Sequence, residues 1–139
     1  MTDKRLPNIT PRDTRRPPAP RRPSESRRLA WNGGRVFVTV GYRDDHLTPC
    51  EIFYDSGYRS GSDMELLVSD LCIALSVMLQ QEGVTAASLV KSMSQSFDLR
   101  TGKPEPGSIL GLLLAEIARP PAWSADLANA LREAEGEPS

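Results

Sequence analysis

One short segment combines glycines, serines and an arginine in a pattern that could bind an anion. Residues 57–62 read Gly-Tyr-Arg-Ser-Gly-Ser and stand directly before a long apolar segment. Free backbone amides at the start of a helix attract phosphate or carboxylate groups, and glycines let such groups approach the backbone closely. The candidate ligand-binding residues are Gly57, Arg59, Ser60, Gly61 and Ser62. An ordinary strand-to-helix turn would also use glycines, so both interpretations stay open.

The N-terminal segment carries a second candidate site because it is strongly basic. Residues 1–28 contain nine Lys and Arg against three acidic residues, whereas the rest of the chain is net acidic. Clustered basic residues bind nucleic acid through its phosphates. The candidate nucleic-acid contacts are Arg15, Arg16, Arg21, Arg22, Arg27 and Arg28. A solubilising tail, or one that associates with the acidic body of its own chain, is the alternative.

Residues that could ligate a metal or act as nucleophiles are few and scattered. The two cysteines, Cys50 and Cys72, have neither CxxC nor zinc-site spacing, and we expect both to be buried free thiols. The single histidine, His46, lies in a polar turn. The serines near Gly61 have no His or Lys base beside them in the sequence. We therefore predict no catalytic residue, no metal and no cofactor.

The anion candidate precedes the longest apolar periodic segment, residues 62–82, which predicts a central helix. Ser62 and Glu65 have capping-box spacing, so we expect the Ser62 hydroxyl to accept the Glu65 amide and the Glu65 carboxylate to accept the Ser62 amide. The predicted core face is Met64, Leu67, Val68, Leu71, Cys72, Leu75, Met78 and Leu79. Acidic residues and glutamines flank the apolar run, so we expect no membrane span.

Upstream of this helix, three segments read as strands. Residues 26–31, 35–42 and 50–54 are separated by turn sequences, and Asn32-Gly33 favours a tight hairpin. We predict an α+β fold in which a three-strand antiparallel meander packs with its apolar face on the central helix.

Downstream, the sequence predicts two or three further helices. Thr85 can cap a short helix, residues 97–107 read as a polar loop, and Ser108 can cap an apolar helix over Ile109–Ala118. We expect that apolar helix to be buried, and a homodimer could share it. Ser124 opens a last amphipathic helix. The predicted organisation is a disordered Pro/Arg-rich arm at 1–28, an α+β domain at 29–118, and a C-terminal helix with an acidic tail at 119–139.

Four motifs follow one another in a particular order along the chain. They are VFVTVGY at 36–42, P-x-E-I-F at 49–53, G-x-x-S-G-S-D at 57–63 and ALSVMLQQEGV at 74–84. In this order they resemble the TSCPD domain, a module at the C-terminus of many adenosylcobalamin-dependent ribonucleotide reductases that also occurs as short stand-alone bacterial proteins. Residues 100–111 look like the tail of the stand-alone branch, and the cysteine-bearing tail of the fused form is missing.

The resemblance implies an accessory or binding module of deoxyribonucleotide metabolism, with a ribonucleotide reductase as its partner. It does not imply the reductase itself, because that chemistry needs at least three cysteines and a cobalamin site, and this chain has two cysteines. The alternatives are a nucleic-acid or acidic-partner binder that uses the arm, and an enzyme that holds a phosphorylated ligand on the 57–63 turn. No apolar leader follows the basic start, so we expect a cytoplasmic protein.

Overall fold

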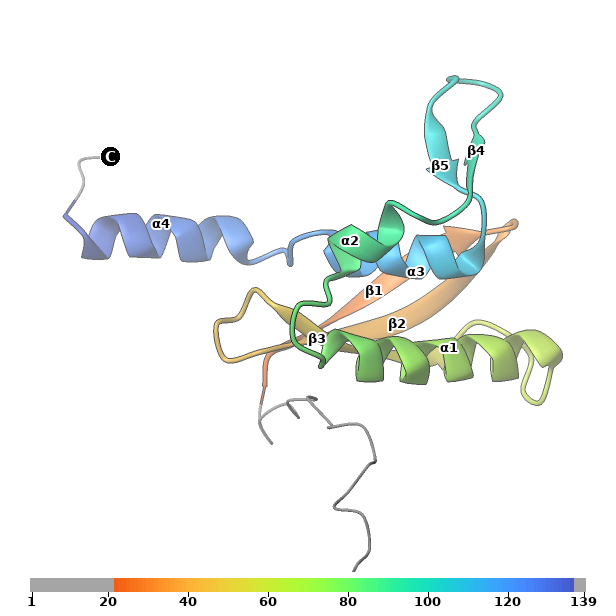
Figure 1. Cartoon of the computed structure of the whole chain (residues 1–139), viewed down its shortest axis with the longest axis horizontal. Helices are drawn as coiled ribbons and strands as arrows, with labels where there is room; N and C mark the ends of the chain where they lie inside the picture. The colour runs from red at the N-terminus through yellow and green to blue at the C-terminus, as the bar shows by residue number, and fades with distance from the viewer. Residues whose placement is uncertain (1–21, 137–139) are drawn as a thin grey trace, which may run out of the picture.

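The computed structural model describes residues 22–136, and its first three strands form one antiparallel sheet (Figure 1). The strands are β1 (Ser24–Trp31), β2 (Gly34–Tyr42) and β3 (Pro49–Ser56), in the order β1-β2-β3. Asn32 and Gly33 make the first turn with φ angles of 49° and 78°, the positive values that a two-residue hairpin loop requires. The predicted α+β fold and the predicted meander are confirmed.

One face of the sheet is almost wholly apolar because residues alternate along each strand. On β2, Val36, Val38 and Val40 point to this inner face and are buried. Leu29 of β1 pairs with Val36, and Ile52 of β3 pairs with Val40, so the apolar rows continue across all three strands.

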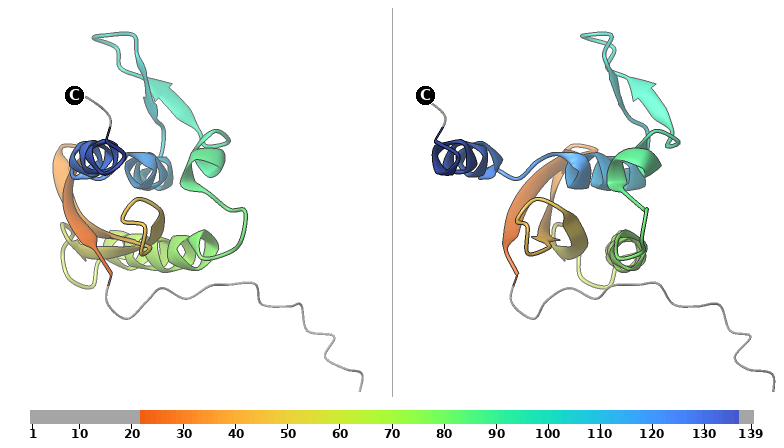
Figure 2. Two further views of the ribbon diagram at one scale, coloured as in Figure 1. Left: turned by 90° about the vertical axis from the view of Figure 1, so that its left-hand side faces the viewer. Right: turned by 60° about the vertical axis from the view of Figure 1, so that its left-hand side comes forward.

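Helix α1 (Asp63–Leu79) lies along the β3 edge of the sheet. The right-hand view of Figure 2 looks nearly along this helix, drawn in green, and shows it beside the strands. Its Ser76 hydroxyl accepts the Ile52 amide at 2.9 Å and lies 3.0 Å from the Ile52 carbonyl, while the Gln80 side-chain amide donates to the Cys50 carbonyl at 3.2 Å. These side chains form hydrogen bonds with backbone groups of β3 that would have no partner at a free sheet edge.

The buried side of α1 differs from the predicted face. Its buried apolar residues are Val68, Cys72, Leu75 and Leu79. Leu67 and Met78, both expected in the core, are exposed. The apolar residues of α1 cover more of its circumference than β3 and the core can bury, so the contact with β3 selects one side.

Helices α2 (Ala86–Val90) and α3 (Ile109–Ala118) pack on each other, and α3 also contacts β3 and α1 (Figures 1 and 2). The predicted caps are confirmed: the Thr85 and Ser108 hydroxyls accept the amides of Ser88 and Gly111 at 3.1 Å each. The buried residues of α3 are Ile109, Gly111, Leu113, Leu114 and Ile117. The predicted burial of α3 is confirmed and takes place within one chain, so it gives no reason to expect a homodimer.

Two C-terminal features stand away from this core. The segment expected to be a polar loop contains a small antiparallel hairpin of β4 (Gln95–Phe97) and β5 (Pro104–Pro106), so that loop prediction was too coarse. Helix α4 (Ser124–Ala134) extends away from the sheet and buries none of its residues (Figure 1).

The structure places residues 24–28, expected to belong to the arm, in strand β1. The folded part includes Ser24–Trp31, because Arg27 and Leu29 of this strand point to the inner face. At the other end, Trp123 packs edge-on against Tyr42 with ring centroids 5.3 Å apart. Residues 1–21, on which most of the predicted disordered arm falls, lie outside the described residues. Within residues 22–136, no helix is long and apolar enough to cross a membrane.

Candidate functional site

The loop between β3 and α1 contains all five residues of the anion candidate. Gly57 has a φ of +137°, and a Cβ placed there would lie 2.5 Å from the Arg35 carbonyl oxygen and 2.9 Å from the Val36 Cα. A side chain at this position would therefore collide with strand β2. Gly57 is needed for the close approach of the loop to the sheet, which accounts for this glycine without a ligand.

The start of α1 already holds its own hydrogen-bond partners. The Ser62 hydroxyl accepts the Glu65 amide at 3.2 Å, as predicted. The Glu65 carboxylate accepts the Gly61 amide at 2.8 Å rather than the Ser62 amide, which instead donates to the Arg59 carbonyl at 3.0 Å. Carboxylates of Asp63 and Glu65 lie in the first turn, where they would repel an anion. The hydrogen bonds of this loop are therefore those of a capped helix start.

Two tyrosines lie stacked beside this loop. The rings of Tyr54 and Tyr58 are 6.4 Å apart with an interplanar angle of 23°, and the Tyr58 amide donates to the Tyr54 hydroxyl at 3.0 Å. Among the described residues, the buried Tyr58 hydroxyl has no hydrogen-bond partner. Burial raises the pKa of Tyr58, so its hydroxyl is neutral at pH 7.

The cysteines and the histidine form no reactive site. Cys50 and Cys72 are free and buried, as predicted. Burial raises the pKa of Cys50, and it raises that of Cys72 to about 11, so both stay as poorly nucleophilic thiols. The His46 carbonyl accepts the Trp123 indole N–H at 2.7 Å. Residues 22–136 contain no cluster of three or more potential metal ligands.

The arginines of the nucleic-acid candidate do not form one surface. Arg15, Arg16 and Arg21 lie outside the part of the chain that the structure describes. Arg28 is exposed, and Arg22 forms an ion pair with Glu51.

Arg27 is only 5% exposed, so its assignment as a nucleic-acid contact is wrong. The arginine pairs of a Pro-rich segment led us to expect a solvated arm. In the structure these residues belong to a strand, and because side chains alternate along a strand, Arg27 points inward and Arg28 outward.

Arg27 is the centre of a buried polar network that closes the C-terminal end of α3. Its guanidinium donates to the carbonyl of Glu116, to the hydroxyl of Tyr42, to the carbonyl of Arg119 at 3.2 Å and to the carboxylate of Glu25 at 2.8 Å. A cation at a helix C-terminus satisfies carbonyls that have no partner within the helix. Sequence alone gave no signal for this role, because the two carbonyls, of Glu116 and Arg119, lie about ninety residues away.

A shallow groove lies beside this network. It has a volume of about 450 Å³ and runs between the β2–β3 loop, the start of α2 and the end of α3. Its lining is mainly apolar and comes from Leu47, Pro49, Thr85, Ala86, Ala87, Ile117, Ala118, Arg119, Pro120, Pro121 and Ser124. The only charged lining residue, Arg119, is paired with Glu116. The groove therefore offers apolar contact without converging polar groups to orient a small ligand.

Among the described residues, α1 carries more exposed large apolar side chains than any other helix or strand. We call the surface that contains them the α1 outer face and define it as Leu66, Leu67, Asp70, Ile73, Ala74, Val77 and Met78, all of which are exposed. Leu66 and Ile73 are 56% and 62% exposed. Leu66, Asp70, Ile73 and Val77 follow one another at spacings of four, three and four residues, so they form one stripe along the helix. Asp70 is the one charged residue of this face.

Comparisons with known proteins identify no relative of this chain. No family model matches the chain, and neither the curated proteins nor the solved structures searched contain a significant match. The TSCPD resemblance therefore stays a prediction.

Proposed function

We propose that this protein is a binding module that docks onto a partner protein through the α1 outer face. The observation that carries the proposal is the exposure of five large apolar side chains, Leu66, Leu67, Ile73, Val77 and Met78, on a single helix. Isolated exposed apolar residues are common, but a contiguous apolar helix face is typical of a protein interaction site. The opposite side of α1 is fixed by the core and by Ser76 and Gln80, so the docking surface is held on a rigid element.

A ribonucleotide reductase is the partner that we propose first. The TSCPD resemblance supports this choice, and three of its four motifs fall on β2, β3 and α1, which are neighbours in the fold. In this proposal the module acts beside the reductase in the cytoplasm, in the supply of precursors for DNA synthesis, without carrying out the reduction.

Affinity capture with matched variants tests this function. Full-length tagged protein is used to capture partners from an extract of the native host, and bound proteins are identified by mass spectrometry. Ile73→Lys places a charge in the middle of the α1 outer face. Leu131→Lys is the control, because Leu131 of α4 is 56% exposed and also lies on an amphipathic helix.

We expect wild-type protein and Leu131→Lys to retain the reductase and Ile73→Lys to lose it. If all three chains recover the same proteins, the α1 outer face is not the docking surface. If Ile73→Lys loses a different enzyme and no chain recovers a reductase, the docking surface stands and the reductase assignment is wrong.

A second candidate function is nucleic-acid binding through the N-terminal residues. It is supported by charge alone: residues 1–21 hold six Lys and Arg against two Asp. Replacing Arg15, Arg16 and Arg21 together by serine leaves every described residue unchanged. Retention of the full chain on DNA at low salt should then fall, with a weaker dependence on salt concentration, if these residues contact phosphates. Unchanged retention would exclude this function.

A further inference from the structure

The charged side chains of α1 all have the same sign. No Lys or Arg occurs between Arg59 and Lys91. Asp63 and Glu65 lie in the first turn of α1, Asp70 lies within the stripe, and Glu82 follows the helix end. A second copy of the same face would therefore bring like charges together when it docked. The face instead fits an occupant that is both apolar and basic.

A segment of the same chain has this composition. Residues 1–21 carry a net charge of +4 from six Lys and Arg and two Asp, against −5 for residues 22–139. They also contain five prolines, Pro7, Pro11, Pro17, Pro18 and Pro20. Proline-rich segments bind apolar grooves and faces at a small entropic cost, because their backbone is already extended.

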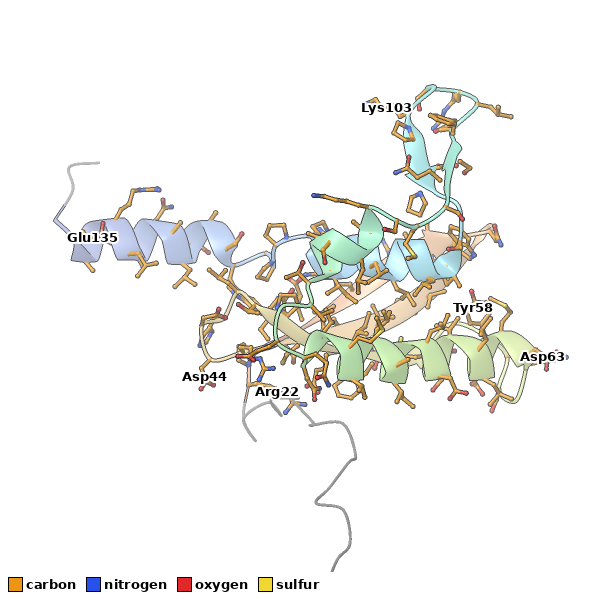
Figure 3. All side chains as sticks on the ribbon, viewed as in Figure 1. Arg22, Asp44, Tyr58, Asp63, Lys103 and Glu135 are labelled. Atoms are coloured by element: carbon orange, nitrogen blue, oxygen red, sulfur yellow. The ribbon has the colours of Figure 1, made fainter. Side chains whose placement is uncertain are left out.

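The point where this segment leaves the described part of the chain is connected to the C-terminal end of α1 through β3. The Pro23 carbonyl accepts the Tyr42 amide at 2.9 Å, and Arg22 pairs with Glu51 of β3. The residue next to Glu51, Cys50, accepts the hydrogen bond from Gln80 at the C-terminal end of α1. Figure 3 labels Arg22 on the side of the molecule where α1 ends and Asp63 at the start of the helix.

The segment is also long enough to cover the face. Helix α1 has 17 residues and is therefore about 25 Å long. At about 3.1 Å per residue, an extended segment of 21 residues spans roughly 65 Å. It could reach from Arg22 past Asp63, so the reach of the chain sets no limit on contact with the whole α1 outer face.

We propose that residues 1–21 lie along the α1 outer face in the free protein. Their prolines contact the Leu66, Ile73 and Val77 stripe, and their arginines pair with Asp70 and Asp63. This inference rests on the proposed function, because it assigns a second occupant to the same surface.

Paramagnetic relaxation measurements on the full chain test the proposal. A nitroxide is attached at Thr10→Cys, and signal loss is measured for the backbone amides of α1. The native Cys50 and Cys72 are buried, which protects them from the labelling reagent, and unsubstituted protein checks this. We expect signals from Leu66 to Val77 to be lost at low salt and restored at about 1 M salt, where the screening length is only about 3 Å.

Charge variants separate specific contact from random approach. Asp70→Lys should restore the α1 signals at low salt, whereas Asp126→Lys, at an exposed acidic residue of α4, should leave the signal loss unchanged. No signal loss at low salt, or equal loss in Asp70→Lys and the wild type, would overturn the inference.

Mixing the copies identifies which chain supplies the segment. Nitroxide-labelled protein without ¹⁵N is mixed with ¹⁵N-labelled protein that carries no nitroxide. Signal loss in this mixture would mean that the segment of a second copy occupies the face, which contradicts the proposal. Failure of the inference is distinct from failure of the proposed function, because reductase capture can still depend on Ile73 when residues 1–21 do not contact α1.

Discussion

Helices α1 and α3 are both rich in apolar residues, yet the fold uses them differently. In α3, the sheet, α2 and the β5 segment surround the helix, and Leu113 is 0% exposed. In α1, one side meets β3 and the core, while Ile73 on the opposite side is 62% exposed. The apolar content of α3 is therefore accounted for by folding. The apolar content of α1 exceeds what folding uses, and the excess is available for a partner.

The largest expected effect concerns the network that closes the end of α3. Replacing Arg27 by Met removes a buried cation and leaves the Glu25 carboxylate and the carbonyls of Glu116 and Arg119 without this partner. Breaking a buried charge pair in this way lowers the free energy of unfolding by about 3–5 kcal/mol. Urea denaturation measures the change. The control is Arg28→Met at the exposed neighbouring position, and equal losses in the two variants would refute the role assigned to Arg27.

A direct comparison of the two helices comes next. Leu113→Ala in α3 should lower the free energy of unfolding by about 2–5 kcal/mol, since it leaves a cavity in the core. Ile73→Ala in α1 should change it by no more than about 0.5 kcal/mol, because its side chain is mostly in solvent. Both values come from the same denaturation experiment. A large decrease in the free energy of unfolding for Ile73→Ala would mean that the α1 outer face contributes to folding. The contrast drawn between α1 and α3 would then be wrong.

The contact between α1 and β3 can be tested at Ser76. Ser76→Ala removes the acceptor of the Ile52 amide, and an unsatisfied buried donor lowers stability by about 1–3 kcal/mol. Ser69→Ala is the matched control on the same helix, where the gain in helix propensity is the same. Stability that is equal in the two variants would show that the edge contact contributes nothing.

The smallest expected effect is the acid sensitivity of the network. Burial alone would raise the pKa of Glu25, but hydrogen bonds from the Ala122 amide and Arg27 outweigh it and hold the pKa below the ordinary 4.5. The unfolded chain therefore binds this proton more readily than the folded chain. The stabilisation from Glu25 is complete above pH 4.5 and is lost as the pH falls through the lower folded-state value.

Urea midpoints measured between pH 6 and pH 3 would show this loss. Glu25→Gln should have a flatter pH profile than the wild type, because the substituted side chain does not titrate. If the pH profiles of Glu25→Gln and the wild type are parallel, the Glu25 carboxylate does not contribute to the stability of the network.

The sequence predicted the local elements of this fold well. Asn32-Gly33, Ser62, Thr85 and Ser108 act through neighbours within a few residues, so their turn and caps could be read directly. The three strands were predicted for the same reason, because alternation and turn residues are local features.

What the sequence did not predict depends on distant contacts. Two partners of Arg27, Glu116 and Arg119, lie near the other end of the described chain, and Ser76 reaches a strand 24 residues earlier. The choice between the two apolar sides of α1 depends on where β3 lies, which no periodicity specifies. The α1 outer face could therefore be identified only from the structure, which shows the side of α1 that contacts β3.

The most direct test of the central claim is a binding titration with purified components. The host ribonucleotide reductase is titrated with wild-type protein, Ile73→Lys and Leu131→Lys, all as full chains. We predict that Leu131→Lys binds as the wild type does and that Ile73→Lys binds at least about tenfold more weakly, as expected for a residue near the centre of an interface. Equal binding by Ile73→Lys and the wild type would contradict the assignment of the α1 outer face as the docking surface.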